Sequence, residues 1–169
     1  LYVRALDQPE PSLVPGTRGA LVPFFSPDGG PLGFWQEDRL KRVPLAGGSV
    51  GTIVGTPYPA GAVWGADDRV IYSENGRLMR ASATGGAPEV LAAADSGSRA
   101  EYRWPELTED GRGLVFTLIP LEGPPELAAL RLEDRRVIRL EQQGMSPHAV
   151  LGGYLSWVDL EGTLQAAPF

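Results

Sequence analysis

The sequence contains no cysteine, so it offers neither a disulfide framework nor a thiolate metal site. Histidine is almost as scarce, because His148 is the only one. The chain has 15 Lys and Arg residues against 21 Asp and Glu residues, which gives a formal net charge of −6, and it has no basic run. This charge balance argues against a nucleic-acid partner.

Long apolar stretches are also missing. None approaches the roughly 20 residues that a helix needs to span a bilayer, and no signal peptide is recognisable. The chain opens on Leu1 rather than methionine, and the strand pattern is interrupted at both ends. We therefore expect a piece of a longer polypeptide, in which any targeting or membrane segment lies elsewhere and this segment makes no membrane contact.

Glycine and proline, by contrast, are abundant, with 22 and 16 residues, as expected where turns are frequent. The stretch 23–48 shows how they are used. Phe24-Phe25 opens an apolar strand that stops at Ser26-Pro27-Asp28-Gly29, where proline presets the first turn position and glycine supplies a positive φ. Two more short strands follow before Gly47-Gly48 turns the chain again.

The same order of landmarks recurs about every 40 residues. A strand that opens on leucine has copies starting at Leu1, Leu40, Leu78, Leu127 and Leu164. An apolar strand that ends in an acidic turn has its aspartate at Asp28, Asp67 and Asp110, and the fourth copy has lost it at Gly152-Gly153. A Gly-Gly turn after the leucine strand is the third landmark. A β-sandwich would also have many short strands, but it would not repeat three landmarks in fixed order.

This pattern predicts an all-β fold, namely a β-propeller of four-stranded antiparallel blades of about 40 residues, with four blade-equivalents in the chain. With strands lettered a to d from the axis outward, 1–19 would supply c and d of a split blade and 146–169 would supply a to c. Complete blades would span 20–56, 60–93 and 101–141. The ring would close with four blades, with further sequence, or with a second chain, and we expect a homodimer.

Several motifs resemble the TolB-like, WD40-like β-propeller repeat family: Phe25-Ser26-Pro27-Asp28-Gly29, the leucine strand with its Gly-Gly turn, and Arg103-Trp104-Pro105 followed by Glu109-Asp110-Gly111. Their order also resembles the propeller that lies C-terminal to the kinase domain and membrane helix of some bacterial serine/threonine protein kinases. The resemblance implies a sensing or protein-binding extension in an extracytoplasmic or periplasmic location, within a membrane-anchored or exported parent. Because the segment lacks every kinase motif, it cannot itself transfer phosphate.

The recurring aspartates invite a metal or acid–base interpretation, which their spacing argues against. They occupy the same turn of successive blades and would lie around the ring rather than converge, so we expect them to cap turns. His148 has no nucleophile elbow to work with. We therefore predict no catalytic residue, no metal, no cofactor and no enzymatic activity. The larger aromatic residues are expected to pack between blades rather than to stack on carbohydrate: Phe24, Phe25, Trp35, Trp64, Trp104 and Trp157.

Residues just before each innermost strand are expected to face the axial opening of the ring. They fall at 18–19, 58–61, 101–103 and 146–148. Among them Tyr58, Glu101, Arg103 and His148 combine aromatic and charged chemistry, and we predict that they bind a protein or small ligand there. The alternative is that they are solvated loop residues.

The sequence thus predicts a non-enzymatic binding or sensor module of a larger bacterial protein, such as a receptor-type serine/threonine kinase. Two alternatives remain open. One is an accessory or gating propeller of a prolyl-oligopeptidase-type peptidase. The other is a TolB-like periplasmic protein that binds envelope proteins.

Overall fold

The computed structural model describes residues 1–58, 60–95, 97–150 and 152–169. Pro59 and Leu151, which fall in two of the segments discussed above, lie outside these ranges. Every regular element in the described ranges is a β-strand, and no helix there has the length and apolar character of a membrane span. The predicted all-β propeller class is confirmed, because the strands form successive antiparallel sheets arranged as blades.

Three complete four-stranded sheets occupy the middle of the chain. The first contains β3 (Leu21–Phe25), β4 (Pro31–Gln36), β5 (Arg39–Pro44) and β6 (Gly51–Gly55). The second contains β7 (Ala62–Trp64), β8 (Arg69–Glu74), β9 (Arg77–Ser82) and β10 (Glu89–Ala92). The third contains β11 (Glu101–Leu107), β12 (Gly113–Ile119), β13 (Glu126–Arg131) and β14 (Val137–Gln143). In each sheet, neighbours in sequence are neighbours in space, as short hairpin connections require.

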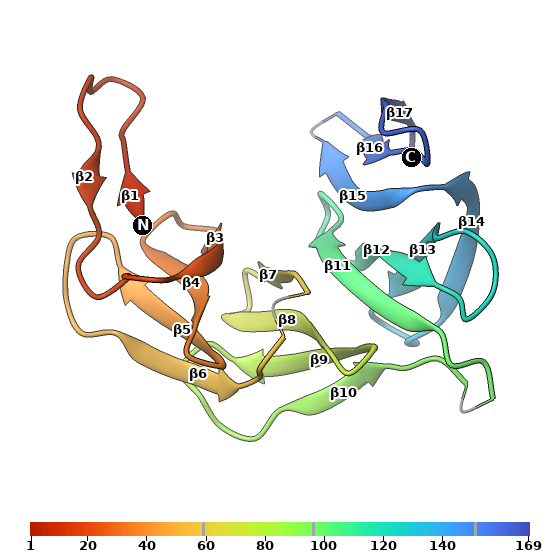
Figure 1. Ribbon diagram of the computed structural model, residues 1–169, viewed down its shortest axis with the longest axis horizontal. Coiled ribbons are helices and arrows are strands. Elements are labelled where there is room, and N and C mark those ends of the chain that lie inside the picture. The colour runs from red at the N-terminus through yellow and green to blue at the C-terminus, as the bar shows by residue number, and fades with distance from the viewer. Residues whose placement is uncertain (59, 96, 151) are drawn as a thin grey trace.

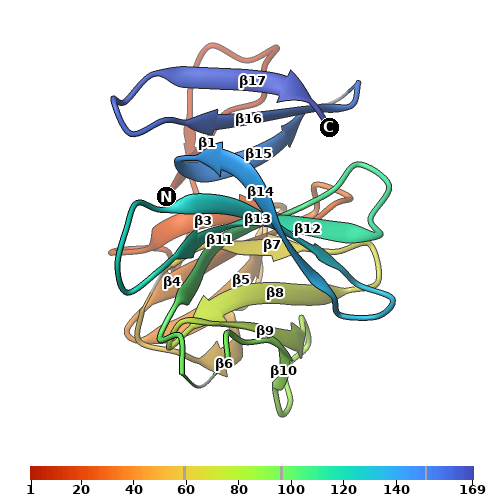
Figure 2. The ribbon, with the colours of Figure 1, turned by 90° about the vertical axis from the view of Figure 1, so that its right-hand side faces the viewer.

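Two incomplete sheets flank these three. The first pairs β1 (Tyr2–Val3) with β2 (Ser12–Leu13). The last contains β15 (Met145–Val150), β16 (Tyr154–Val158) and β17 (Leu164–Pro168). The blades follow one another around an arc, with the two incomplete sheets at its two ends across an open side (Figure 1). The side view shows β15, β16 and β17 as neighbouring strands of one sheet beyond the third sheet (Figure 2).

Apolar side chains from facing sheets fill the spaces between blades. Between the first and second sheets, the ring of Phe24 lies 6.2 Å from that of Trp35 and 6.3 Å from that of Trp64, measured between centroids. In the third sheet, the Tyr102 and Phe116 rings are 4.8 Å apart. The expectation for Phe25 was wrong, because its side chain is 57% exposed while its neighbour Phe24 points inward. Alternation along a strand places only one of two adjacent residues in the core.

The innermost strands share a local distortion. Within each, or just before it, one residue has a positive φ: Val22 (48°), Gly61 (94°), Trp104 (51°) and Ser146 (53°). In three of the four, this residue precedes a proline, and the pairing with the next strand shifts register there. Such a bulge bends the strand, and proline is tolerated because an innermost strand has a free edge that needs no donor.

The recurring aspartates cap turns. Asp28 Oδ1 accepts hydrogen bonds from the Ser26 hydroxyl at 2.5 Å and from the Gly30 N–H at 3.0 Å. Asp110 Oδ1 accepts from the Thr108 hydroxyl and the Arg112 N–H in the same way. These bonds lower the pKa of both carboxyl groups, with the side-chain hydroxyl as the largest cause. The turn residues therefore hold the hairpins, as their sequence predicts.

Candidate functional site

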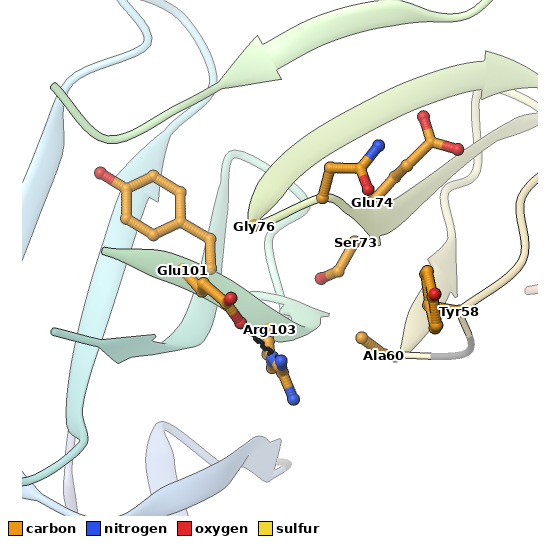
Figure 3. A pocket seen from close by; sticks show the side chains of 9 residues that line it. Tyr58, Ala60, Ser73, Glu74, Gly76, Glu101 and Arg103 are labelled. Atoms are coloured by element: carbon orange, nitrogen blue, oxygen red, sulfur yellow. Dashed lines mark hydrogen bonds and ion pairs between the residues drawn. The ribbon is translucent and has the colours of Figure 1, made fainter. Parts of the chain in front are cut away.

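A pocket of about 230 Å³ opens between the second and third sheets. Three separate segments line it (Figure 3). Tyr58 and Ala60 come from the connection between β6 and β7, residues 73–76 come from the end of β8 and its hairpin turn, and residues 101–103 come from the start of β11. The pocket thus lies where the β8–β9 hairpin turn of the second sheet meets the innermost strand of the third sheet, β11.

The hairpin between β8 and β9 reaches the pocket through its Asn75-Gly76 turn. Both residues have positive φ, 49° and 72°, as a two-residue hairpin with this sequence requires. The Gly76 carbonyl accepts a hydrogen bond from the Tyr102 N–H at 3.0 Å. A Cβ at position 76 would meet Glu101 Cγ at 3.0 Å, so glycine allows the close approach of this turn to β11.

The connection before β7 is held in place by β11 and by β8. The Ala60 carbonyl accepts a hydrogen bond from the Trp104 N–H at 2.8 Å, and the Gly61 carbonyl accepts one from the Ser73 N–H at 3.2 Å. The bulge at Trp104 makes the first bond available, because a residue at a bulge is left unpaired in its own sheet. The three segments of the pocket are therefore held together by backbone hydrogen bonds.

Charge in the pocket is dominated by one ion pair. The Arg103 guanidinium donates to Glu101 Oε2 from two nitrogens, at 2.9 and 2.5 Å. Both side chains are partly exposed. Glu74 also lines the pocket, but it follows Ser73 directly in β8, so its carboxylate points away from Ser73 and from the ion pair (Figure 3).

A buried hydroxyl is the most unusual group of this site. The side chain of Ser73 is 1% exposed, and its Oγ has no hydrogen-bond partner among the described residues. An unpaired buried polar atom costs about 1–3 kcal/mol relative to a paired one. Figure 3 shows this hydroxyl pointing toward the side of the pocket where Glu101 and Arg103 lie. A polar ligand entering the pocket would meet a group that still has its hydrogen bonds to make.

His148 lies apart from this pocket, in β15 of the last sheet. Its Nδ1 is 3.9 Å from Oε2 of Glu106 in β11. Burial raises the pKa of the Glu106 carboxyl above its usual value, and the adjacent histidine partly offsets this. Glu106 and His148 each follow the positive-φ residue and proline of their strand, so the repeat itself sets them side by side.

The structure thus brings three of the four predicted binding residues together, since Tyr58, Glu101 and Arg103 line one pocket, and it places His148 elsewhere. Glu101, Arg103 and His148 lie inside strands rather than before them. Sequence reasoning missed Ser73, Glu74 and the Asn75-Gly76 turn. The Asn-Gly pair was visible as a hairpin signal, but its contact with β11 depends on how two blades pack.

The described residues contain no group of three or more histidine or acidic side chains arranged to hold a metal ion. The described part of the pocket provides hydrogen-bonding, charged and aromatic groups, and the Glu106–His148 pair lies outside it.

The class of protein that this architecture defines is the β-propeller. No protein-family model matches the sequence, and no curated protein matches it. Solved structures do. A putative TolB from Agrobacterium tumefaciens superposes with a TM-score of 0.70 at 20% identity, over 86% of this chain and 56% of that one. A gluconolactonase from Xanthomonas campestris gives 0.67 at 16% identity, over 87% and 56%.

A puromycin-hydrolysing peptidase from Mycobacterium tuberculosis is also similar, with a TM-score of 0.69 at 16% identity over 92% of this chain and 28% of the peptidase. The chain therefore spans about half the length of the TolB and lactonase structures and less than a third of the peptidase. At these identities the likeness shows the fold. These structures support the predicted β-propeller fold, with a TolB among the similar structures. They do not support the predicted resemblance to the propeller of bacterial serine/threonine kinases.

The prediction that the segment is not an enzyme is contradicted, because solved structures that share its fold include a peptidase and a lactonase. The absence of a nucleophile elbow excludes a serine nucleophile of one type. It does not exclude general acid–base hydrolysis, for which a paired carboxylate and imidazole are sufficient groups.

Proposed function

We propose that this segment is a recognition propeller that binds a peptide segment or a small polar ligand in the pocket between its second and third sheets. The observation that carries the proposal is the unpaired, buried hydroxyl of Ser73 in a pocket where Tyr58, Glu101 and Arg103 converge from separate segments. Polar groups converging in a hollow on a rigid sheet scaffold are the usual form of a binding site.

The test is selection of random peptides displayed on phage against the immobilised chain, counted in parallel against a Tyr58→Ala, Arg103→Ala double variant. We expect peptides that bind the native chain and lose binding to the variant. Both side chains are partly or largely exposed, so urea unfolding of the variant should stay close to that of the native chain. Peptides that bind both proteins equally would refute the proposal.

A second candidate function is hydrolysis of a small ester or lactone at the Glu106–His148 pair. The specific observation that favours it is a carboxylate with a raised pKa within 3.9 Å of an imidazole, on innermost strands of adjacent blades. Glu106 would take a proton from water as it adds to the carbonyl carbon, and protonated His148 would donate a proton to the leaving alkoxide as the ring C–O bond breaks. A lactone gives one hydroxy acid, an ester gives one carboxylic acid and one alcohol, and passage of the proton from Glu106 to His148 restores the pair.

This candidate is tested with glucono-δ-lactone, whose opening releases acid that a pH-stat records. We expect a rate above the spontaneous one that Glu106→Gln and His148→Gln each abolish, while Tyr58→Ala leaves it unchanged. A native rate equal to the spontaneous rate would exclude this lactone and this pair as a hydrolytic site.

The parent protein is a separate proposal. A receptor-type serine/threonine kinase, a prolyl-oligopeptidase-type peptidase and a TolB-like periplasmic protein each remain candidates, and each is compatible with an extracytoplasmic location. The similarity to a minor part of a peptidase chain supports the second, and the similarity to a TolB supports the third. A kinase domain, a hydrolase domain or a lone secretory signal in the complete reading frame would decide among them.

We also propose that a second copy covers the open side of the arc. Large apolar side chains are exposed at both of its ends, among them Tyr2 (72%), Leu6 (99%) and Leu164 (73%). The sheet at one end has two strands and the sheet at the other has three. Unpaired strand edges with apolar faces associate readily, and a head-to-tail pair would cover both ends at once.

A further inference from the structure

We infer that the pocket between the second and third sheets recognises an uncharged amide group, presented by a peptide as its main chain or as an asparagine or glutamine side chain. This inference rests on the proposed recognition function and adds the chemistry of the ligand. It follows from a comparison of equivalent positions in two blades and from the charge balance of the pocket.

The repeat gives the buried hydroxyl of Ser73 a counterpart in the next blade. In β8, Ser73 lies opposite Leu78. In β12, Thr117 lies opposite Leu127, which occupies the same place in the leucine repeat as Leu78. The side chains of Ser73 and Thr117 are 1% and 0% exposed. The two residues are therefore buried hydroxyls at equivalent positions of successive blades.

These two hydroxyls differ in their partners. Thr117 Oγ1 accepts a hydrogen bond at 3.0 Å from the N–H of Ser146, the positive-φ residue of the following blade. The corresponding residue of the third sheet is Trp104, but its N–H donates to the Ala60 carbonyl instead. Ser73 Oγ is therefore left without the amide donor that its counterpart receives. An amide N–H from a ligand would take the place of that donor.

The charges of the pocket balance each other. Glu101 and Arg103 form an ion pair, so an incoming anion meets the carboxylate and an incoming cation meets the guanidinium. Both hydrogen bonds of the pair go to Glu101 Oε2, from Arg103 Nε and Nη2. Oε1 can therefore still accept a hydrogen bond, and Nη1 can still donate one. An amide carries an N–H donor and a carbonyl acceptor without a charge, which suits this pair of groups.

The position of Ser73 limits the size of the group that binds. Its hydroxyl points toward the side of the pocket where Glu101 and Arg103 lie (Figure 3). Because the side chain is buried, a ligand reaches the hydroxyl when Ser73 turns to another staggered conformer. The pocket, at about 230 Å³, is smaller than the roughly 300 Å³ at which sites for drug-sized ligands begin. One amide group enters it, and the rest of the peptide stays outside.

The first test is an NMR titration of the chain with N-methylbutyramide and with 3-hexanone, a ketone of the same shape that has a CH₂ in place of the N–H. We expect both to shift the backbone amide signals of Gly76 and Tyr102, which lie at the pocket. The amide should bind roughly fivefold more tightly, the share of one hydrogen bond. Butylammonium and butyrate should each bind more weakly than the amide. Equal binding of amide and ketone, or tighter binding of either charged probe, would overturn the inference.

A variant locates the acceptor of the amide N–H. Ser73→Ala removes a hydroxyl that has no hydrogen-bond partner among the described residues, so urea unfolding should stay close to that of the native chain. We expect this variant to bind the amide and the ketone equally. The matched control is Ser82→Ala in β9, whose hydroxyl pairs with Thr84 outside the pocket, and it should keep the full preference for the amide. An undiminished preference in Ser73→Ala, or the same loss in Ser82→Ala, would overturn the site.

One further probe distinguishes the sources of the amide. Butyramide presents a primary carboxamide, as asparagine and glutamine side chains do, whereas N-methylbutyramide presents a secondary amide, as the main chain does. The probe that binds more tightly, with a dependence on Ser73, identifies the source. Peptides selected on phage that need Tyr58 and Arg103 but bind Ser73→Ala as tightly as the native chain would refute the amide site while leaving the recognition function intact.

Discussion

Gly61 packs directly against Trp104: a Cβ at Gly61 would come within 2.7 Å of the Trp104 Cα. The two residues belong to different blades, and a hydrogen bond from the Trp104 N–H to the neighbouring Ala60 carbonyl, at 2.8 Å, holds them in this position. Both have positive φ, 94° and 51°. This backbone-to-backbone contact joins the second and third blades beside the candidate site.

Gly61→Ala should therefore destabilise the chain by about 2–4 kcal/mol, because it adds backbone strain at φ 94° to an overlap with backbone atoms that cannot move aside. Urea unfolding measures the loss. The matched control is Gly29→Ala, at φ 69° with no atom near its added Cβ, which should cost only about 1 kcal/mol. Equal losses at the two positions would mean that the contact with Trp104 contributes nothing.

Gly33 and Phe24 give a second test of packing. A Cβ at Gly33 would lie 2.1 Å from Phe24 Cζ, so Gly33→Ala should cost about 1–3 kcal/mol by displacing the ring. Phe24→Leu removes the overlapping atoms. In the double variant the cost of the alanine should therefore fall by at least half, which a double-mutant cycle of unfolding free energies measures. Strict additivity of the two changes would contradict this packing.

Stability should depend on pH through Glu106. Burial raises the pKa of its carboxyl above the usual 4.5, so the folded chain holds this proton more tightly than the unfolded chain. The resulting stabilisation is fully present below pH 4.5 and is lost as the pH rises through the folded pKa. Glutamine cannot ionise, so Glu106→Gln should gain stability relative to the native chain as the pH rises through this window.

Unfolding midpoints in urea, recorded at a series of pH values, test this expectation. Glu122→Gln, in an exposed loop, serves as the control and should track the native curve at every pH. A Glu106→Gln curve parallel to that of the native chain throughout would show that the folded environment does not favour the protonated carboxyl.

Closure of the arc by a second copy predicts a dimer in solution. Light scattering during gel filtration should give twice the mass of one chain, and Leu164→Glu should give a single chain, because it places a charge on an apolar end that is otherwise covered. Leu121→Glu is the control, since it changes an equally accessible leucine in the loop after β12. A monomeric native chain, or a Leu164→Glu variant that stays dimeric, would rule out this mode of closure.

The fold was predictable from the sequence because its signals are local and repeated. The turn from Ser26 to Gly29 and its counterpart at Asp110-Gly111 act within a few residues, and each forms as its sequence indicates. Tyr58, Glu101 and Arg103 could be grouped because the repeat puts the entrance of each blade at the same end. For Phe24 and Phe25, the prediction held for Phe24 only. Adjacent side chains of a strand point to opposite faces, and two neighbouring aromatic residues do not show which of them faces the core.

The rest of the site depends on contacts between blades. Nothing near Ser73 in the sequence indicates that its hydroxyl loses every partner when β11 docks, because that loss comes from residues far along the chain. The Glu106–His148 pair was accessible in principle, since each residue follows a proline at the same offset in its repeat. It was overlooked because the copies were aligned on aspartate and leucine, which occupy the other ends of the strands.

The kink at the entrance of each blade has a consequence for how such proteins change over time. Each blade has its own distortion in or just before its innermost strand, at Val22, Gly61, Trp104 and Ser146, and the residues that form it belong to that blade. A duplicated or deleted blade would therefore bring or remove its own distortion, so the number of blades can change by simple gene rearrangement while the shape of each remaining innermost strand is preserved.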